Sequence, residues 1–580
     1  EADYGPYPKG LMYYLTMMDS WLYDETKPFI HIEAGDTFDE LKKDARNGYF
    51  EKLIKEYLLD NNHKSIISLV PEYGLEKEKE QKEADKLAEY KSTLTNDELE
   101  ELVKKTKELK EYQDTPSSQE DLEKIPMLEL SDIKREPAKD YNDVKSVDGI
   151  KIVHHNIFTN KIAYINMSFD TKCVPDELIP YMGLLGSTLS LMDTKNYTYP
   201  ELTNEININC GGLATGTALY SDKVDFSKNT IVYEVKSKAL YEKVPFVLGM
   251  MEEIMYNTRF DDYKRLKEII ARIKSRLEAS LMGQGHSIAM LECCAQFSES
   301  AYYSDILRGY KYYEFIKKLD EEFEQNKTQI VDKLNKLVGY IFNKDNVIVS
   351  LTADDEGYDC FVKALSAKSC NIKDEHYNTA VRSFIPVNVK TGYTSASQVQ
   401  YVARCGNFVK DGYKYTGALK VLKVIFSYDY LWINVRVKGG AYGCMSGSSR
   451  NGDFYMVSYR DPNLEKTNDI YEGAADYIRN FDVSRRDMVK FIIGTIGEID
   501  APLTPSAIGS RSFTHYMCNC TEDMLRKDRE EVLDATVESI RELAPLIESA
   551  VGQNYLCVVG NQKQINEAAD LFDEIKPLIG

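Results

Sequence analysis

Apolar and polar residues alternate in several short stretches of the chain, and this pattern predicts β-strands. In one of them Ile165, Met167 and Phe169 alternate with Asn166 and Ser168. A period of two is that of a strand with one buried face. Longer stretches with apolar residues at helical spacing follow such strands. Strands followed by a run of helices predict the α+β class, in which helices cover one face of a sheet.

Three apolar strand-like stretches, each leading into a helix, indicate an internal repeat. They begin at Ser65, Asn346 and Asn554, and the last two starts are 208 residues apart (554 − 346). The first two, aligned at Ser68 and Ser350, are 282 residues apart (350 − 68). The excess equals about the length of a charged insertion that follows the first stretch. A period of about 200 residues predicts duplicated domains rather than a solenoid.

A pair of glycines occurs at matching places in two of these units. Gly211-Gly212 and Gly439-Gly440 are 228 residues apart (439 − 211). Each pair follows a long apolar helix and precedes strand-like residues and another helix. The pair is therefore expected to mark the same turn in both copies.

The charged insertion, rich in Glu and Lys, runs from Leu75 to Tyr112. It contains two helical segments, and the second opens with a capping box in which Thr95 and Glu98 satisfy the first free N–H groups. Prolines then interrupt the helical pattern. We predict that residues 73–140 form a helical hairpin and an extended linker between two globular parts. A disordered linker is the alternative.

Length and charge limit the classes of function. At 580 residues and 66.4 kDa the chain is too long for one hydrophobic core, which predicts several domains. A net charge of −21 argues against nucleic-acid binding, which needs clustered Lys and Arg. No apolar run approaches the ~20 residues of a membrane helix, so we expect no membrane partner.

The eleven cysteines are scattered through the chain rather than packed into a small domain. This favours free thiols in a reducing compartment, and we expect a cytoplasmic protein. The chain opens with Glu1-Ala-Asp, without an initiator Met or a leader pattern, which indicates a segment of a longer polypeptide.

The histidines do not form a recognisable metal motif. No pair among the seven has the i, i+4 spacing of a helical zinc site. His154 and His155 are adjacent in an apparent strand and should point to opposite faces. His515, Cys518 and Cys520 are the best local cluster of soft ligands, but a fourth ligand is missing. Nucleophile-elbow, phosphate-loop and dinucleotide motifs are also absent, so spacing alone indicates no self-sufficient active site.

The segment from Arg436 to Gly443, Arg-Val-Lys-Gly-Gly-Ala-Tyr-Gly, is followed by Ser-Tyr-Arg-Asp-Pro-Asn at 458–463. Together they closely resemble a segment of the presequence proteases, zinc metallopeptidases of the pitrilysin/insulinase superfamily. Blocks at 61–64, 125–133, 285–286 and 500–505 also match in order. The resemblance extends over essentially the whole chain and implies the C-terminal half of such an enzyme.

The resemblance implies a domain plan. Members of the family have four homologous α+β domains, two in each half, and a helical hairpin joins the halves. Residues 1–72 would complete the second domain, and 73–140 would form the hairpin and linker. Residues 141–372 would be the third, non-catalytic domain. Residues 373–580 would be the fourth. The fold expected is therefore tandem pitrilysin-type domains joined to an N-terminal half by a hairpin.

The resemblance also implies site residues. Arg436 and Tyr442 would reach the catalytic chamber and donate hydrogen bonds to the negative charge on the scissile carbonyl oxygen. Gly439 and Gly440 would let the backbone approach the substrate. Zinc would be bound in the N-terminal half by an inverted His-x-x-Glu-His motif, so we expect no metal ligand in this chain.

The internal repeat separates fold from function at this segment. At the 228-residue offset Arg436 and Tyr442 match Ile208 and Ala214, whereas the glycine pair is retained. The glycines therefore follow the fold, and the Arg and Tyr are peculiar to the last domain. Structural roles, such as an ion pair between Arg436 and a surface carboxylate, are the alternative.

The function implied is half of a zinc endopeptidase that degrades unfolded peptides inside a closed chamber made by two halves. Its partners would be the N-terminal catalytic half and unfolded peptides. Two other functions stay open: a structural or regulatory subunit that has lost the metal motif, and a passive peptide-binding module. Retention of Arg436 and Tyr442 speaks against the former, and cleavage of bound peptides would exclude the latter.

Overall fold

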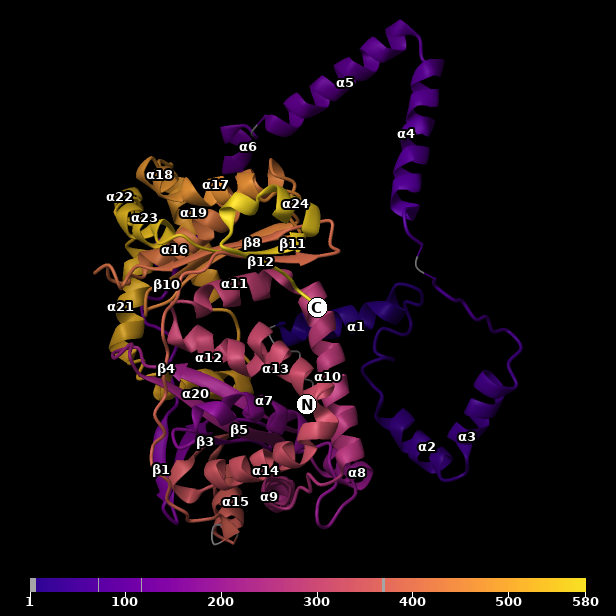
Figure 1. Ribbon diagram of the computed structural model, residues 1–580, viewed down its shortest axis with the longest axis vertical. Helices are drawn as coiled ribbons and strands as arrows, with labels where there is room; N and C mark the ends of the chain where they lie inside the picture. Colours follow the sequence, from indigo (N-terminus) through magenta and orange to yellow (C-terminus); the bar gives the residue numbers. More distant parts are fainter. Residues whose placement is uncertain (1–6, 71, 116, 368–370, 580) are drawn as a thin grey trace. The chain divides into compact units, whose positions relative to one another are not determined.

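A computed structural model describes residues 7–70, 72–115, 117–367 and 371–579 (Figure 1). The chain divides into two compact units, Tyr7–Leu128 and the part that begins at Glu129. Each unit is described separately. Among the described residues, no helix has the length and apolar character needed to span a membrane.

The unit Tyr7–Leu128 is helical. Its elements are α1 (Lys9–Trp21), α2 (Gly35–Ala45), α3 (Tyr49–Leu53), the π-helix η1 (Ile54–Leu59), α4 (Leu75–Thr93), α5 (Asn96–Asp114) and α6 (Gln119–Glu123). The long helices α4 and α5 meet at a sharp turn (Figure 1). The predicted capping box is present there: the Glu98 N–H donates to Thr95 Oγ1 and the Thr95 N–H donates to Glu98 Oε2, at 3.3 and 2.8 Å.

The same unit lacks a core of its own. Of the residues described between Tyr7 and Leu128, none is buried. The stretch from Ser65 to Val70, predicted as a strand, is extended but unpaired, and Ile66 and Leu69 are 97% and 96% exposed. The strand prediction is therefore wrong for this chain alone, because a strand needs a neighbouring strand for its hydrogen bonds.

The second unit contains two six-stranded sheets. The first consists of β1 (Asp143–Val147), β2 (Ile150–Asn156), β3 (Ile162–Asp170), β4 (Leu213–Ser221), β5 (Asn229–Leu240) and β6 (Val347–Ala353), in the order β1-β2-β6-β3-β5-β4. Among these six described strands, only β2 and β6 pair in parallel. As the alternating pattern predicted, Ile165, Met167 and Phe169 are buried in the core.

The second sheet repeats the first. It consists of β7 (Thr391–Ser395), β8 (Tyr401–Asn407), β9 (Gly443–Ser448), β10 (Asp453–Tyr459), β11 (Tyr555–Asn561) and β12 (Glu574–Pro577), in the order β12-β7-β11-β8-β10-β9. The five strands from β7 to β9 match those from β2 to β4, including one parallel pair. The predicted duplication of α+β domains is confirmed.

Helices follow the strands in both copies. The first copy has α7 (Ile179–Thr188), α8 (Tyr199–Asn209), α9 (Val244–Tyr256), α10 (Tyr263–Gly283), α11 (Gly285–Ala295), α12 (Glu299–Arg308), α13 (Tyr310–Glu321), α14 (Phe323–Ile341) and α15 (Asp355–Ser366). The second has α16 (Ala418–Ile425), α17 (Glu465–Glu472), α18 (Ala474–Arg479), α19 (Arg485–Ile499), α20 (Pro505–Met517), α21 (Glu522–Leu533), α22 (Val537–Arg541), α23 (Ala544–Gly552) and α24 (Gln562–Glu567). Short 3-10 turns lie at Leu130–Asp132, Asp176–Leu178, Tyr241–Lys243, Lys344–Asn346 and Ala569–Leu571.

The two copies exchange one helix each. Helix α11 of the first copy packs on the second sheet, and α20 of the second copy packs on the first sheet (Figure 1). Glycines allow both approaches. A Cβ on Gly285 would overlap the ring of Tyr401, and one on Gly509 would overlap the side chain of Thr352. Each sheet is therefore covered on one face by its own helices and on the other by a helix of its neighbour.

The sequence alignment of the repeats is wrong by one residue at the central strand. A spacing of 208 pairs Val349 with Cys557, but Val349 packs in the core of its own copy, whereas Cys557 packs against α11. In β11 the residues that face their own helices are Leu556 and Val558. Because side chains alternate along a strand, a slip of one residue reverses every side chain between the two faces.

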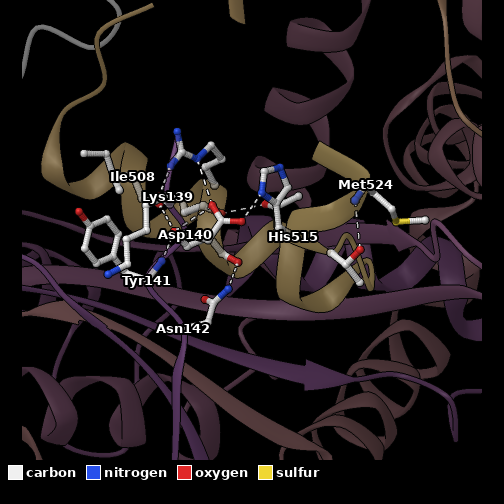
Figure 2. A network of polar contacts seen from close by, with 12 residues as sticks. Lys139, Asp140, Tyr141, Asn142, Ile508, His515 and Met524 are labelled. Atoms are coloured by element: carbon white, nitrogen blue, oxygen red, sulfur yellow. Dashed lines mark hydrogen bonds and ion pairs between the residues drawn. The ribbon is translucent and has the colours of Figure 1, made fainter. Parts of the chain in front are cut away.

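The last part of the stretch predicted as linker belongs to the second compact unit, which begins at Glu129. Residues 129–142, here called the strap, lie along α20 and α21. The Asp140 carboxylate accepts a hydrogen bond from His515 at 2.7 Å, and the Tyr141 N–H donates to Ser512 Oγ at 3.1 Å (Figure 2). Arg529 donates to the Lys134 carbonyl at 2.8 Å. The strap is thus docked on the second copy before it enters the first sheet.

Candidate functional site

The segment that resembles the presequence proteases ends an unusual helix. Helix α16 continues into two π-helical stretches, η7 (Phe426–Tyr430) and η8 (Trp432–Val437). The predicted long helix before the glycine pair is therefore present, but its second half is widened. Such π-helical segments occur frequently at functional sites.

The glycine pair ends this helix in a tight turn. The Gly440 N–H donates to the Arg436 carbonyl at 2.8 Å and the Ala441 N–H to the Val435 carbonyl at 3.1 Å. Gly440 has φ +84°, and a Cβ on Gly439 would overlap the carbonyl oxygen of Val435. Both positions therefore require glycine for the turn itself. The matching Gly212 has φ +105°, so the turn is common to the two copies as predicted.

Arg436 lies beside two aromatic rings. Its guanidinium carbon is 3.9 Å from the centre of the Trp432 ring and 5.9 Å from that of Tyr442. Among the described residues, no carboxylate forms an ion pair with Arg436. Stacking on an aromatic face holds a guanidinium while its N–H groups stay free to donate. The role of Trp432 was missed in the sequence, although its place one helical turn before Arg436 is a usable signal.

Tyr442 follows the turn and is 67% exposed. Its N–H donates to the Arg460 carbonyl at 3.2 Å, and its ring packs edge to face on Tyr459 at 5.8 Å between ring centres. Within the described part of the chain, its hydroxyl has no hydrogen-bond partner. The structure therefore brings two unpaired donors, Arg436 and Tyr442, to the same side of the turn.

The Ser-Tyr-Arg-Asp-Pro-Asn segment supports this turn. Asn463 donates from Nδ2 to the Gly439 carbonyl at 2.6 Å. The buried Asp461 accepts from the Asn463 N–H and from Thr467 Oγ1 at 2.9 and 2.7 Å. Burial raises the pKa of Asp461, and these hydrogen bonds offset that effect only in part. The loop is thereby tied to the body of the domain.

Cys444, two residues after Tyr442, does not add a nucleophile. Burial raises the pKa of its thiol to about 11, with the positive charge of Arg436 acting in the opposite direction. Because the thiolate is the reactive form, this thiol is unreactive at neutral pH.

The histidines singled out in the sequence have structural partners. His154 and His155 do point to opposite faces of β2: His154 stacks on Tyr358 of α15, whereas His155 contacts Phe513 of α20. His155 bonds the Tyr141 carbonyl and, at 2.9 Å, Ser350 Oγ. Burial lowers the pKa of both imidazoles.

The described residues do not fit a zinc centre. Nδ1 of His515 is engaged by Asp140 rather than by Cys518 or Cys520. The one described group with ligand atoms close enough to share an ion is Asp345, Asp374 and His376, all exposed, and His376 Nδ1 already bonds Asp345. Zinc sites in proteins use a tetrahedral set dominated by His and Cys, which this group does not supply.

Comparisons with known proteins agree with this architecture. Residues 69–319 match a family model for the domain associated with subfamily C of the M16 peptidases, and residues 392–561 match the PreP C-terminal domain. The chain is 40% identical over 584 residues to Protein HypA of Clostridium perfringens. It is 29% identical over 591 residues to Presequence protease 1, chloroplastic/mitochondrial, of Arabidopsis thaliana. Both alignments cover 100% of this chain but 59% and 54% of those proteins, so the chain spans little more than half of their length.

Solved structures share the fold. The peptidase M16 inactive domain from Pseudomonas fluorescens aligns with a TM-score of 0.51 and 14% identity, over 72% of this chain and 97% of that one. A conserved protein from Enterococcus faecalis aligns with a TM-score of 0.53 and 13% identity, with the same coverage.

Two α+β domains of one strand order, each lending a helix to the other's sheet, define a tandem pitrilysin-type half. The chain belongs to the presequence protease-like branch of the pitrilysin peptidase family and corresponds to its C-terminal half. The resemblance drawn from the Arg436–Asn463 segment is thereby confirmed at the level of family and fold.

Proposed function

We propose that this chain is the half of a zinc-dependent endopeptidase that encloses unfolded peptides and supplies Arg436 and Tyr442 to the reaction. The observation that carries the proposal is the arrangement of these two side chains. Both present unpaired donors beside the glycine turn, Arg436 half-buried and Tyr442 largely exposed. The matching positions in the first copy, Ile208 and Ala214, have no such groups.

The chemistry of these donors fits peptide hydrolysis. Attack on a peptide carbonyl builds negative charge on its oxygen, and preorganised donors that point at this oxygen stabilise the transition state. The guanidinium of Arg436 would donate as a planar cation. The Tyr442 hydroxyl would donate as a neutral phenol. Gly439 and Gly440 would keep the backbone of the turn low enough for a substrate to approach.

The N-terminal unit supports a partner. Its helices α1 and α2 and the unpaired stretch from Ser65 to Val70 expose apolar side chains such as Phe38, Ile66 and Leu69. In the repeats, the corresponding strands β6 and β11 lie inside a sheet with neighbours on both sides. We infer that residues 1–72 complete a domain whose remaining strands belong to an N-terminal half, covalently linked or associated.

The same proposal assigns the rest of the chain. Residues 73–140 would link the halves, with the strap docked on the second copy, and 141–372 and 373–580 would be the third and fourth peptidase-like domains. Zinc would be held by the N-terminal half, since the described residues of this chain offer no suitable ligand set. The ten cysteines that the structure describes are all free, which supports a cytoplasmic location.

Reconstitution tests the proposal. An unfolded fluorogenic peptide is incubated with this chain alone, with a zinc-binding N-terminal half alone, and with both together. We expect cleavage that depends on zinc and on the presence of both parts. Cleavage by this chain alone after a chelator wash, or no cleavage by the zinc-loaded combination, would contradict it.

A further inference from the structure

A cavity of about 430 Å³ lies between the first sheet and helix α20. Its walls come from β3, β5 and β6, from the glycine turn before β4, and from the first three turns of α20. It lies at the turn that matches the Arg436–Tyr442 site in the other copy, because Gly211, Gly212 and Ala214 line it. The assigned functional residues do not reach it.

The charge of this cavity contrasts with that of the chain. Its charged lining residues are two lysines, Lys236 and Lys238, and its described lining contains no Asp or Glu. The whole chain carries a net charge of −21. Lys236 forms an ion pair with the buried Glu234 at 2.5 Å, so its charge is largely neutralised. Lys238 has no carboxylate partner among the described residues.

Lys238 is held in place by the glycine turn. A Cβ on Gly211 would lie 2.6 Å from Lys238 Cγ, so the aliphatic chain of the lysine passes directly over the glycine. The Gly211 N–H also donates to the Lys238 carbonyl at 2.8 Å. This packing restricts the lysine and leaves its ammonium group without an anion from the described part of the protein.

Helix α20 adds to the positive potential. Its first turn, which begins at Pro505 and is capped by Thr504, contributes Ser506 to the cavity, and Ser510 follows one turn later. The N-terminal end of a 13-residue helix carries a partial positive charge that favours an anion. The serines offer hydroxyl donors beside it.

The shape of the sheet indicates which anion fits. Strand β4, which begins at Leu213 beside the cavity, is the edge strand of the first sheet. An extended peptide that pairs antiparallel with an edge strand gains backbone hydrogen bonds. Run in that direction along β4, its last residue would lie at Leu213, next to Lys238. The terminal carboxylate would then be the anion nearest to the free ammonium group.

We propose that this cavity binds the C-terminal carboxylate of an extended peptide whose backbone pairs with β4. The proposal rests on the proposed function only in taking peptides as the substrate class. It would give the enzyme a second contact with its substrate, remote from the Arg436–Tyr442 turn along the repeat.

The test is direct binding to the chain of 580 residues, without the zinc-binding half. The probe is a decapeptide of alternating serine and alanine with a C-terminal leucine and an N-terminal fluorescein, followed by fluorescence anisotropy. A free carboxylate is compared with the C-terminal amide of the same peptide. We expect the amide to bind about tenfold more weakly, because one charge-assisted hydrogen bond is lost.

Variants localise the site. Lys238→Gln keeps the length of the side chain and should weaken binding of the free acid about tenfold while leaving the amide unchanged. Ala214→Phe should fill the cavity and weaken binding of the free acid. Lys264→Gln, the same change at an exposed lysine of α10, should leave binding unaltered. Circular dichroism on each variant checks the fold.

Equal binding of acid and amide, or equal binding of the acid to the parent and to Lys238→Gln, would overturn the proposal. So would absence of binding at millimolar peptide. None of these outcomes bears on cleavage by the reconstituted enzyme, because the assay contains neither zinc nor turnover. Loss of cleavage in that enzyme, conversely, would leave this binding result standing.

Discussion

Nδ1 of His515 lies 2.7 Å from a carboxylate oxygen of Asp140, although 375 positions separate the two residues in the chain. This contact joins the strap to helix α20, which itself covers the first sheet (Figure 2). Arg511 lies on the same carboxylate at 3.3 Å. Burial raises the pKa of Asp140, but the hydrogen bond and charge of His515 and the charge of Arg511 outweigh burial and lower it.

The first prediction concerns this clamp. Asp140→Asn removes the charge and should lower the free energy of opening of the strap by about 1–2 kcal/mol at neutral pH. Amide hydrogen exchange over residues 129–142 measures it. Because the pKa of Asp140 is depressed in the fold, its contribution is present above the ordinary Asp pKa and is lost as pH falls through the folded pKa. The difference between parent and variant should shrink accordingly in acid.

A matched control is available on the same strap. Asp534, which pairs with Arg135 at 2.8 Å, is 59% exposed in its side chain. Asp534→Asn should change strap exchange by less than about 1 kcal/mol, since exposed ion pairs contribute little. Equal effects of the two substitutions would show that the clamp has no special weight.

The second prediction concerns His155, which is fully buried. Burial lowers its pKa from 6.5 to about 4. The unfolded chain then binds a proton at higher pH than the fold does. Stability should therefore fall as pH drops from about 6.5 to 4, by about 3 kcal/mol from this residue. Thermal unfolding of His155→Gln as a function of pH should show a shallower fall, while an unchanged slope would assign the pH dependence to other groups.

The third prediction concerns the proposed chemistry. In an enzyme that contains both halves, Tyr442→Phe removes one donor and should cost roughly 2.7–4 kcal/mol, or about 10²–10³ in kcat. Arg436→Lys keeps the charge but loses the planar fork, and should also impair turnover. Steady-state cleavage of an unfolded peptide measures both, and zinc content should stay at the parent value.

The control for these variants is Ile208, which matches Arg436 in the first copy and is 74% exposed. Ile208→Val should leave kcat and stability near those of the parent. A rise in KM with kcat unchanged would instead assign Tyr442 to ground-state binding. If Tyr442→Phe left kcat within about twofold, a role in the transition state would be excluded.

The fourth prediction concerns metal content. We expect this chain, washed with chelator, to retain no stoichiometric zinc, because its described histidines are engaged by protein groups or lack further His and Cys ligands around them. Elemental analysis of the purified chain measures this directly. One tightly bound zinc per chain would place the metal centre in the wrong half.

The fifth prediction concerns the linker. The described residues of helices α4 and α5 are exposed, apart from the half-buried Leu99, and should exchange amide hydrogens fast. The strap should exchange more slowly, and the central strand β6 most slowly of all. Exchange in α4 and α5 as slow as in β6 would contradict a hinge role for the hairpin.

Several features of the protein follow from its local sequence. The alternation around Ile165 placed a strand correctly, and the Thr95–Glu98 pair placed a helix start, because strand period and capping chemistry depend on neighbouring residues. The glycine pairs marked the same turn in two domains for a similar reason: only glycine readily takes the positive φ found at Gly212 and Gly440. The family was identified from one extended segment.

Tertiary structure decided what covers each apolar face. Periodicity shows that α11 and α20 have buried sides, but not that each packs on the sheet of the other copy. A letter match between Val349 and Cys557 could not show that the two side chains point to opposite faces. Likewise the stacking of Arg436 on Trp432 and the docking of Asp140 on His515 depend on contacts across the fold. Sequence sets local conformation, whereas partner choice depends on which surfaces pack together with the least unfilled space and unpaired charge.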